Sequence, residues 1–267
     1  MTTPPRFNVL GVGVHAVNLS RATDQVVTAA RGSTPGYVCF CDVNSVSCAR
    51  RDPKHLATLN RSLLTTPDGM PLVWLGKHSG QRNVGRVYGP DLMLAVCRAT
   101  AGSELTHYFY GGGPGTAEAL AVALKVRFPG MKIVGTECPP YRPLATDEAA
   151  ELAKRIQTIR PSFFWVGLST PKQEAFMAEY SPRLGVPVML GVGAAFDFLS
   201  GRIRQAPRWV QGSGFEWCWR LCAEPRRLAP RYFKNNPLFL LRILAQLTGL
   251  KKYPADWEEP AGRETCG

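Results

Sequence analysis

The chain has 267 residues, 45% of them hydrophobic, and a mean hydropathy of −0.10, values typical of an ordered protein with one α/β domain, alone or with an appendage. Its 32 basic residues outnumber 20 acidic ones, and the net charge of +12 favours an anionic partner: a phosphate-bearing ligand, anionic lipid or nucleic acid. A spanning helix is disfavoured because no apolar run approaches ~20 residues, and a signal peptide is disfavoured because its pattern does not open the chain. A zinc site is disfavoured because none of the eight cysteines forms a CxxC pair. We therefore expect a cytoplasmic protein.

The N-terminal part alternates apolar runs with helical patterns. The expected elements are a strand over 7–14 that ends in glycines, a helix over 19–31 capped by Asn18 or Ser20, a buried strand over 37–43, and a helix that starts at Asp52 and Pro53 and extends to about residue 63. Asn44 and Ser45 stand where the second strand gives way to a helical segment.

The turn at 65–71 places an acidic residue between proline and glycine, ahead of an apolar run. Pro67 disfavours the α conformation in the residue before it, and Gly69 permits a sharp turn. Asp68 is therefore expected on a tight loop that leads into a helix. Such a carboxylate is either a helix N-cap or a general base that projects into a cleft beside a sheet.

The next part continues the alternation as far as about residue 200. The expected elements are helices at 90–99, 116–127 and 147–159, a helix opened by the loop 168–174, and strands at 106–110, 132–134, 163–167 and 186–192. Near-continuous apolar strands between helices predict an α/β fold with a Rossmann-like, mostly parallel sheet covered by helices. We assign residues 1–200 to this α/β domain.

Residues 201–267 differ in character and predict a basic, aromatic-rich helical appendage. Its basic residues are Arg202, Arg204, Arg208, Arg220, Arg226, Arg227, Arg231, Lys234, Arg242, Lys251 and Lys252. Tryptophan, tyrosine and phenylalanine are interleaved with them, and two or three short helices broken by Gly212, Gly214 and Pro225 are expected. This mixture fits a helix in a membrane interface, a clamp on a nucleotide diphosphate, or a solvated basic face.

Four loops at the carboxyl ends of the predicted strands are candidate binding sites, because ligands of parallel α/β sheets bind there. Their candidate residues are Asp42 and Asn44, then Gly111, Gly112 and Gly113, then Gln173, then Gly191, Gly193 and Asp197. Glycine turns let backbone amides approach a phosphate or sugar. The run at 111–115 matches neither GxGxxG nor the P-loop, which weakens nicotinamide and NTPase interpretations and leaves a purely structural turn open.

A series of motifs in one order carries a family resemblance. They are PDGM at 67–70, RVYGPDL at 86–92, YGGGPG at 110–115, VGLSTPKQE at 166–174, GVGAAFD at 191–197 and APRW at 206–209, followed by EW at 216–217, RL at 220–221 and EPRR at 224–227. The chain resembles the WecG/TagA/CpsF family of bacterial glycosyltransferases from about residue 8 to about residue 243. The resemblance implies an inverting, metal-independent transfer of a sugar, of the N-acetylmannosamine or glucose type, from a UDP-sugar to a polyprenyl-diphosphate-linked sugar. The absence of an Asp-x-Asp pair agrees with metal independence.

The resemblance also implies residue roles. Asp68 takes the place of the family's catalytic base, and Arg86 and Gln173 hold the sugar or the acceptor diphosphate. Asn44 keeps the second residue of the family's Thr-x-Asn pair, whereas Asp42 replaces the threonine and is an alternative base. The residues alone leave Gln173 open as a helix cap and Arg86 as the partner of a surface carboxylate.

No cofactor and no metal are expected, so arginines must offset the charge that builds on the departing UDP. The candidates are Arg208, Arg220, Arg226 and Arg227. The resemblance places the appendage over the active site and against the inner face of the cytoplasmic membrane. Nucleic acid is not an expected partner, and a homo-oligomer is compatible with the sequence.

Two other classes of protein remain as alternatives. One is a Rossmann-like enzyme that binds a nucleotide cofactor through its glycine loops. The other is a non-catalytic, basic binder of membranes or nucleic acid, whose binding would depend strongly on salt and survive loss of Asp68.

Overall fold

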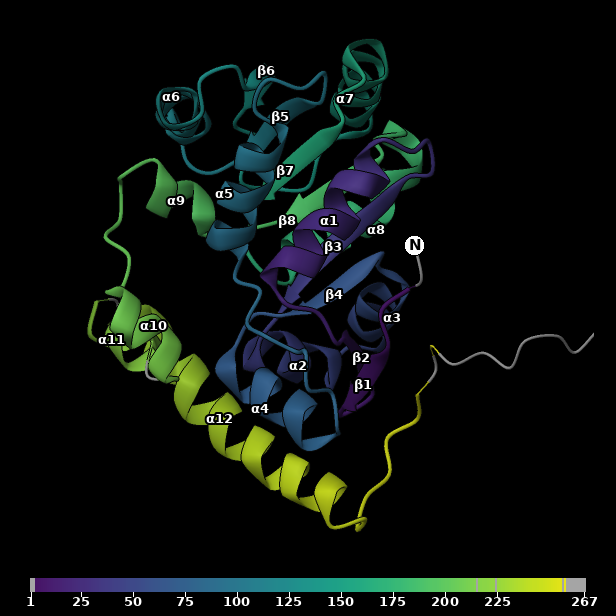
Figure 1. Ribbon diagram of the computed structural model, residues 1–267, viewed down its shortest axis with the longest axis vertical. Coiled ribbons are helices and arrows are strands. Elements are labelled where there is room, and N and C mark those ends of the chain that lie inside the picture. Colours follow the sequence, from purple (N-terminus) through teal and green to yellow (C-terminus); the bar gives the residue numbers. More distant parts are fainter. Residues whose placement is uncertain (1–2, 215, 224, 256, 258–267) are drawn as a thin grey trace, which may run out of the picture.

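The computed structural model describes residues 3–214, 216–223, 225–255 and 257. Within them, a six-stranded parallel sheet with the order β4-β3-β8-β7-β5-β6 forms the centre of the molecule (Figure 1). Its strands are β3 (Gly36–Cys41), β4 (Leu64–Pro67), β5 (Thr106–Gly111), β6 (Lys132–Glu137), β7 (Phe163–Gly167) and β8 (Val188–Gly191). The predicted α/β class is confirmed, and the apolar runs form strands because both faces of the sheet are buried.

Helices cover both faces of this sheet. One layer contains α1 (Leu19–Ala30), α5 (Gly89–Thr100), α6 (Thr116–Arg127) and α9 (Ala195–Leu199). The other contains α2 (Val43–Ala49), α3 (Pro53–Arg61), α4 (Met70–His78), α7 (Thr146–Ile159) and α8 (Lys172–Leu184). Alternate residues of β3 divide between the two cores, with Val38 and Phe40 facing the first layer and Cys39 and Cys41 the second.

Two local expectations were wrong. Residues 7–14 form a hairpin of antiparallel strands, β1 (Arg6–Val9) and β2 (Val12–His15), where one strand was predicted. The chain reverses at Leu10 and Gly11, which both have positive φ, and glycine adopts this conformation without strain. The other error concerns residues 64–67, which were expected to lie between a helix that ends near residue 63 and the turn at 65–71. They form strand β4, because they pair with β3.

Side-chain caps explain where several helices begin. Asn18 caps α1 and accepts a hydrogen bond from Arg21 N at 3.0 Å, which decides between the two predicted caps. Asp52 caps α3 through Lys54 N at 2.9 Å. Asp42 ends β3 and caps α2 through Ser45 N at 2.8 Å, so one of the predicted site residues also organises the local backbone.

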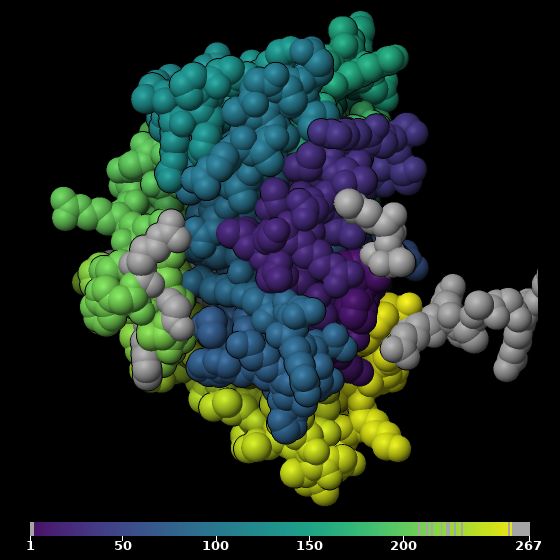
Figure 2. All heavy atoms as spheres, in the orientation of Figure 1, coloured from purple at the N-terminus to yellow at the C-terminus, as the bar shows by residue number. Residues whose placement is uncertain are grey.

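The appendage consists of α10 (Arg208–Ser213), α11 (Glu216–Ala223) and α12 (Pro225–Leu247). The expectation of only short helices was wrong, because α12 has 23 residues, begins at Pro225 and continues through two internal prolines. It runs along α2 and α4, and Figure 2 shows described parts of the appendage on the left side (light green) and along the bottom (yellow) of the molecule. In the described part of the chain, no helix combines the length and apolarity needed to cross a membrane.

The appendage shares the core of the α/β domain. Phe239 and Ile243 of α12, and Tyr253 beyond it, are buried in the same hydrophobic cluster as the β1–β2 hairpin. Gln246 donates to Asn8 O and accepts from Leu10 N, both at 2.8 Å, and so ties the end of α12 to the hairpin turn. These contacts hold α12 across the carboxyl end of β3.

Candidate active site

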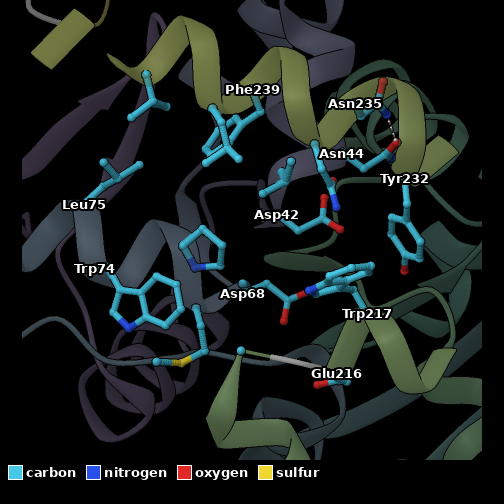
Figure 3. Close-up of a pocket in the computed structure, with 18 of the residues that line it drawn as sticks. Asp42, Asn44, Asp68, Trp74, Leu75, Glu216, Trp217, Tyr232, Asn235 and Phe239 are labelled. Carbon is cyan, nitrogen blue, oxygen red and sulfur yellow. Dashed lines mark hydrogen bonds between the residues drawn. The ribbon is translucent and has the colours of Figure 1, made fainter. Parts of the chain in front are cut away.

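A cavity of about 980 Å³ lies where the carboxyl ends of β3 and β4 meet the appendage (Figure 3). Four of the predicted residues line it together: Asp42, Asn44, Asp68 and Arg86. Most of the remaining lining comes from α2, α4 and the three appendage helices, and Tyr88 adds to it. The cavity is therefore built from segments more than 100 residues apart in the sequence.

Asp68 follows the last residue of β4 and is held through its backbone. Its N–H donates to Cys41 O at 2.9 Å, and its carbonyl accepts from Arg86 Nε at 2.7 Å. The side chain is 22% exposed and points into the cavity. The helix-cap interpretation was wrong, because Gly69 is the N-cap of α4 and no side chain caps this helix.

Arg86 connects Asp68 to the appendage. Its Nη1 donates to Gln211 O at 2.8 Å, and its Nη2 lies 2.6 Å from Glu216 Oε2 and 3.9 Å from Asp68 Oδ1. Its guanidinium stacks on the Tyr88 ring at 4.3 Å. Burial lowers the pKa of Arg86, and the Asp68 and Glu216 carboxylates together raise it by more than burial lowers it. The net shift of the pKa is therefore upward, and the guanidinium keeps its charge. The sequence left open that Arg86 pairs with a surface carboxylate. It does pair with a carboxylate, but with that of Glu216, a half-buried residue of α11.

Asn44 is also fixed by the appendage. Its Oδ1 accepts from Asn235 Nδ2 at 3.1 Å, and Asn235 Oδ1 accepts from Arg51 Nη1 at 2.9 Å (Figure 3). Asp42 Oδ1 is engaged by Ser45, through both its N–H and its hydroxyl. Asn235 and Glu216 were not predicted as site residues. The sequence signals for Glu216 were its place in the EW motif at 216–217 and its position as one of few acids in a basic segment.

Gln173 lies in the first turn of α8, beside the end of β8. Its Nε2 donates to Gly191 O at 2.6 Å and to Glu174 Oε1 at 3.2 Å, so its side chain does not cap the helix. Glu174 is fully buried, accepts from Thr170 Oγ1 at 2.8 Å, and has its pKa raised to about 7 by burial. Gln173 is not part of the cavity lining described above.

The glycine loop after β5 has a structural explanation for its sequence. Gly111 has a φ of 133°, and a Cβ there would lie 2.6 Å from Gly167 O, so this position requires glycine. The guanidinium of Arg202 bonds to Thr116 Oγ1 and Pro114 O and covers the loop. The predicted binding residues of this loop and of the loop after β8 do not line the cavity: Gly111, Gly112, Gly113, Gly191, Gly193 and Asp197.

Of the four arginines predicted to bind the diphosphate, the structure describes the side chain of one. Arg226 is exposed at the start of α12. The side chains of Arg208, Arg220 and Arg227 lie outside the described residues.

Comparison with known proteins points to one family. The model described as "Glycosyl transferase WecG/TagA/CpsF family" matches residues 7–253. Relatives from Bacillus spizizenii (strain ATCC 23059 / NRRL B-14472 / W23) and Bacillus subtilis (strain 168) are 28% and 26% identical, over 73% and 77% of this chain and 74% and 77% of theirs. A relative from Staphylococcus aureus (strain MRSA252) is 21% identical over 92% of this chain and 95% of its own. All three are named N-acetylglucosaminyldiphosphoundecaprenol N-acetyl-beta-D-mannosaminyltransferase.

Proposed function

This chain belongs to the WecG/TagA/CpsF family of glycosyltransferases, and on that premise we propose that it transfers a sugar from a UDP-sugar to a polyprenyl-diphosphate-linked sugar, with inversion and without a metal. The names of the relatives support N-acetylmannosamine as the sugar transferred and an N-acetylglucosaminyl-diphosphate lipid as the acceptor. Membership in this family argues against the cofactor-enzyme and non-catalytic alternatives.

The observation that carries the proposal is the placement of Asp68 in the cavity. Its carboxylate accepts the proton of the acceptor hydroxyl while that oxygen attacks C1 of the donor sugar. The C1–O bond to UDP breaks in the same displacement, which inverts the configuration at C1. Arg86 acts as a positioning residue, because three of its donors hold the Asp68 carbonyl, the Gln211 carbonyl and Glu216.

The departing UDP requires positive charge at its diphosphate. Arg226 and the arginines at 208, 220 and 227 supply it in this proposal, since guanidinium groups pair well with phosphate oxygens. The sequence has no Asp-x-Asp pair, and among the described residues no group of three or more His, Cys, Asp or Glu could hold a metal ion. We expect transfer to persist in excess EDTA; a complete loss that Mg²⁺ or Mn²⁺ restores would contradict the role given to the arginines.

A lipid-linked acceptor requires access to a membrane surface. The C-terminal end of α12 and the turn after it expose Leu244, Leu247 and Leu250 next to Lys251 and Lys252. Apolar and basic residues together suit the interface of an anionic membrane. We propose peripheral association with the inner face of the cytoplasmic membrane.

The decisive experiment is a screen of UDP-sugars with a polyprenyl-diphosphate-linked N-acetylglucosamine acceptor, with release of UDP as the readout. We expect UDP-N-acetylmannosamine to be consumed only when the acceptor is present, and the product to have the opposite anomeric configuration. Release without acceptor, or no release with any UDP-sugar, would contradict the proposed reaction.

A further inference from the structure

The lining of the cavity is divided by polarity. In Figure 3, Asn44, Asn235 and Tyr232 lie on one side of Asp68, and Trp74, Leu75 and Phe239 lie on the other. Leu240, Ile243, Met70 and Pro71 add further hydrocarbon surface to the lining. We call the part lined by Trp74, Leu75, Phe239, Leu240 and Ile243 the apolar end.

The apolar end is formed where two helices face each other. Residues 232, 235–236, 239–240 and 243 of α12 recur every three or four positions and so lie on one face of the helix, toward the cavity. Trp74 and Leu75 of α4 supply the opposite wall. Leu241 does not line the cavity and is 66% exposed, which shows that this face ends at Leu240.

The chemistry of the apolar end does not suit a sugar or a nucleotide. Its five residues carry one hydrogen-bonding side-chain group, the indole N–H of Trp74, while His78 of α4 and Asn236 of α12 line the cavity one turn away. The hydroxyls of a sugar or the polar edge of uracil would therefore lose water against these five side chains and gain few partners. The volume of about 980 Å³ is at the upper end of the range for small-molecule pockets, so there is room beside the reacting sugars for a further part of a substrate.

We propose that the apolar end binds the first isoprenoid units of the acceptor, those next to its diphosphate. This rests on the proposed function, in which the acceptor is a polyprenyl-diphosphate sugar, and names the part of the site that recognises its lipid. Trp74 and Leu240 are 53% and 60% exposed and form the mouth, from which the rest of the prenyl chain passes to the membrane along the exposed leucines at the C-terminal end of α12. The acceptor is then held on both sides of its diphosphate, with its sugar at Asp68 and its first prenyl units against α4 and α12.

The test compares two neighbouring leucines of similar exposure. Leu240→Gln alters the apolar end, whereas Leu241→Gln makes the same change on the adjacent, outward position of α12. Farnesyl diphosphate is the probe, and its Kd is measured by calorimetry with the full chain in detergent-free buffer. We expect Leu240→Gln to weaken binding by about 10-fold, because the apolar contact that Leu240 makes with the bound prenyl chain is lost, and Leu241→Gln to change it by less than about 2-fold.

Three measurements make the outcome decisive. Thermal unfolding of both variants should match the parent chain, since both side chains are largely exposed. UDP binding should be the same in all three proteins; a loss in Leu240→Gln equal to that for farnesyl diphosphate would assign the apolar end to the nucleotide and overturn the inference. Equal weakening by Leu240→Gln and Leu241→Gln would also overturn it, because it would indicate a general apolar surface.

The inference and the proposed function fail in different ways. Normal sugar transfer without any dependence of prenyl binding on Leu240 overturns the inference alone. Absence of sugar transfer, with Leu240-dependent binding of farnesyl diphosphate intact, counts against the proposed reaction alone. As a third readout, the kcat/KM of the parent chain should rise as the acceptor is lengthened from one to three isoprenoid units, and Leu240→Gln should flatten this rise.

Discussion

At the scale of single residues, Asp68 is held through its backbone, and its carboxylate points into the cavity with Oδ1 3.9 Å from Arg86 Nη2. Asp68→Asn preserves the backbone contacts with Cys41 O and Arg86 Nε, and it removes the basic oxygen together with the negative charge beside Arg86. We expect turnover to fall by about 10²-fold or more, the range typical of a lost general base, with UDP affinity unchanged in a titration. Turnover at the parent rate would reject this base and make Asp42 the next candidate, to be examined with Asp42→Asn.

Glu174 gives a second prediction, in the pH dependence of stability. Burial raises its pKa in the folded chain to about 7, and the nearby charge of Asp42 acts in the same direction. The folded state therefore holds this proton more tightly than the unfolded state, so the free energy of unfolding falls as pH rises from about 4.5 to about 7 and then levels off. We expect Glu174→Gln to remove this decline, by up to about 3 kcal/mol.

Urea unfolding of the parent chain and Glu174→Gln between pH 5 and pH 8 measures this effect. The comparison isolates Glu174, because His15 and His107, whose pKa values burial lowers to about 3, are present in both proteins. Parallel pH profiles for the two proteins would show that Glu174 titrates normally in the folded chain.

At the scale of elements, α12 connects the appendage to the domain and forms one wall of the cavity. Gln246 satisfies a backbone N–H and a backbone carbonyl of the β1–β2 hairpin, much as a neighbouring strand would. Gln246→Ala leaves both groups without this partner, and we expect a loss of about 1–3 kcal/mol in the free energy of unfolding. Lys234→Ala, at an exposed position of the same helix, is the matched control and should change it by less than about 0.5 kcal/mol. Equal effects would show that Gln246 does not hold α12.

At the scale of the whole molecule, the net charge of +12 and the exposed leucines of the appendage predict attraction to anionic lipid. Charge reversal at Arg242, Lys251 and Lys252 should weaken liposome binding by about 1 kcal/mol per charge. Transfer to a water-soluble, short-chain acceptor should stay nearly constant, because none of these residues lines the cavity. Sedimentation with vesicles containing anionic lipid measures the first effect, and retention of full binding after triple reversal would contradict the assigned membrane surface.

The sequence by itself determined the fold class and the motif-bearing loops at the strand ends. Strand runs such as 163–167 and helices such as α6 follow from local patterns of apolar residues, which depend only on near neighbours. The caps at Asn18 and Asp52 are equally local. The resemblance named the family on the same motifs, and the family match over residues 7–253 confirmed it.

Only the tertiary structure decided which of these loops share a cavity. Arg86, which holds Asp68, meets Glu216, and Asn44 meets Asn235, because α12 docks across the end of β3 through residues buried far along the chain. A pairing over 130 or 191 residues leaves no periodicity in the sequence, since its energy comes from shape, burial and hydrogen bonds that exist only once both elements are in place. For the same reason β4, whose four residues form a strand by pairing with β3, could not be predicted from its own composition.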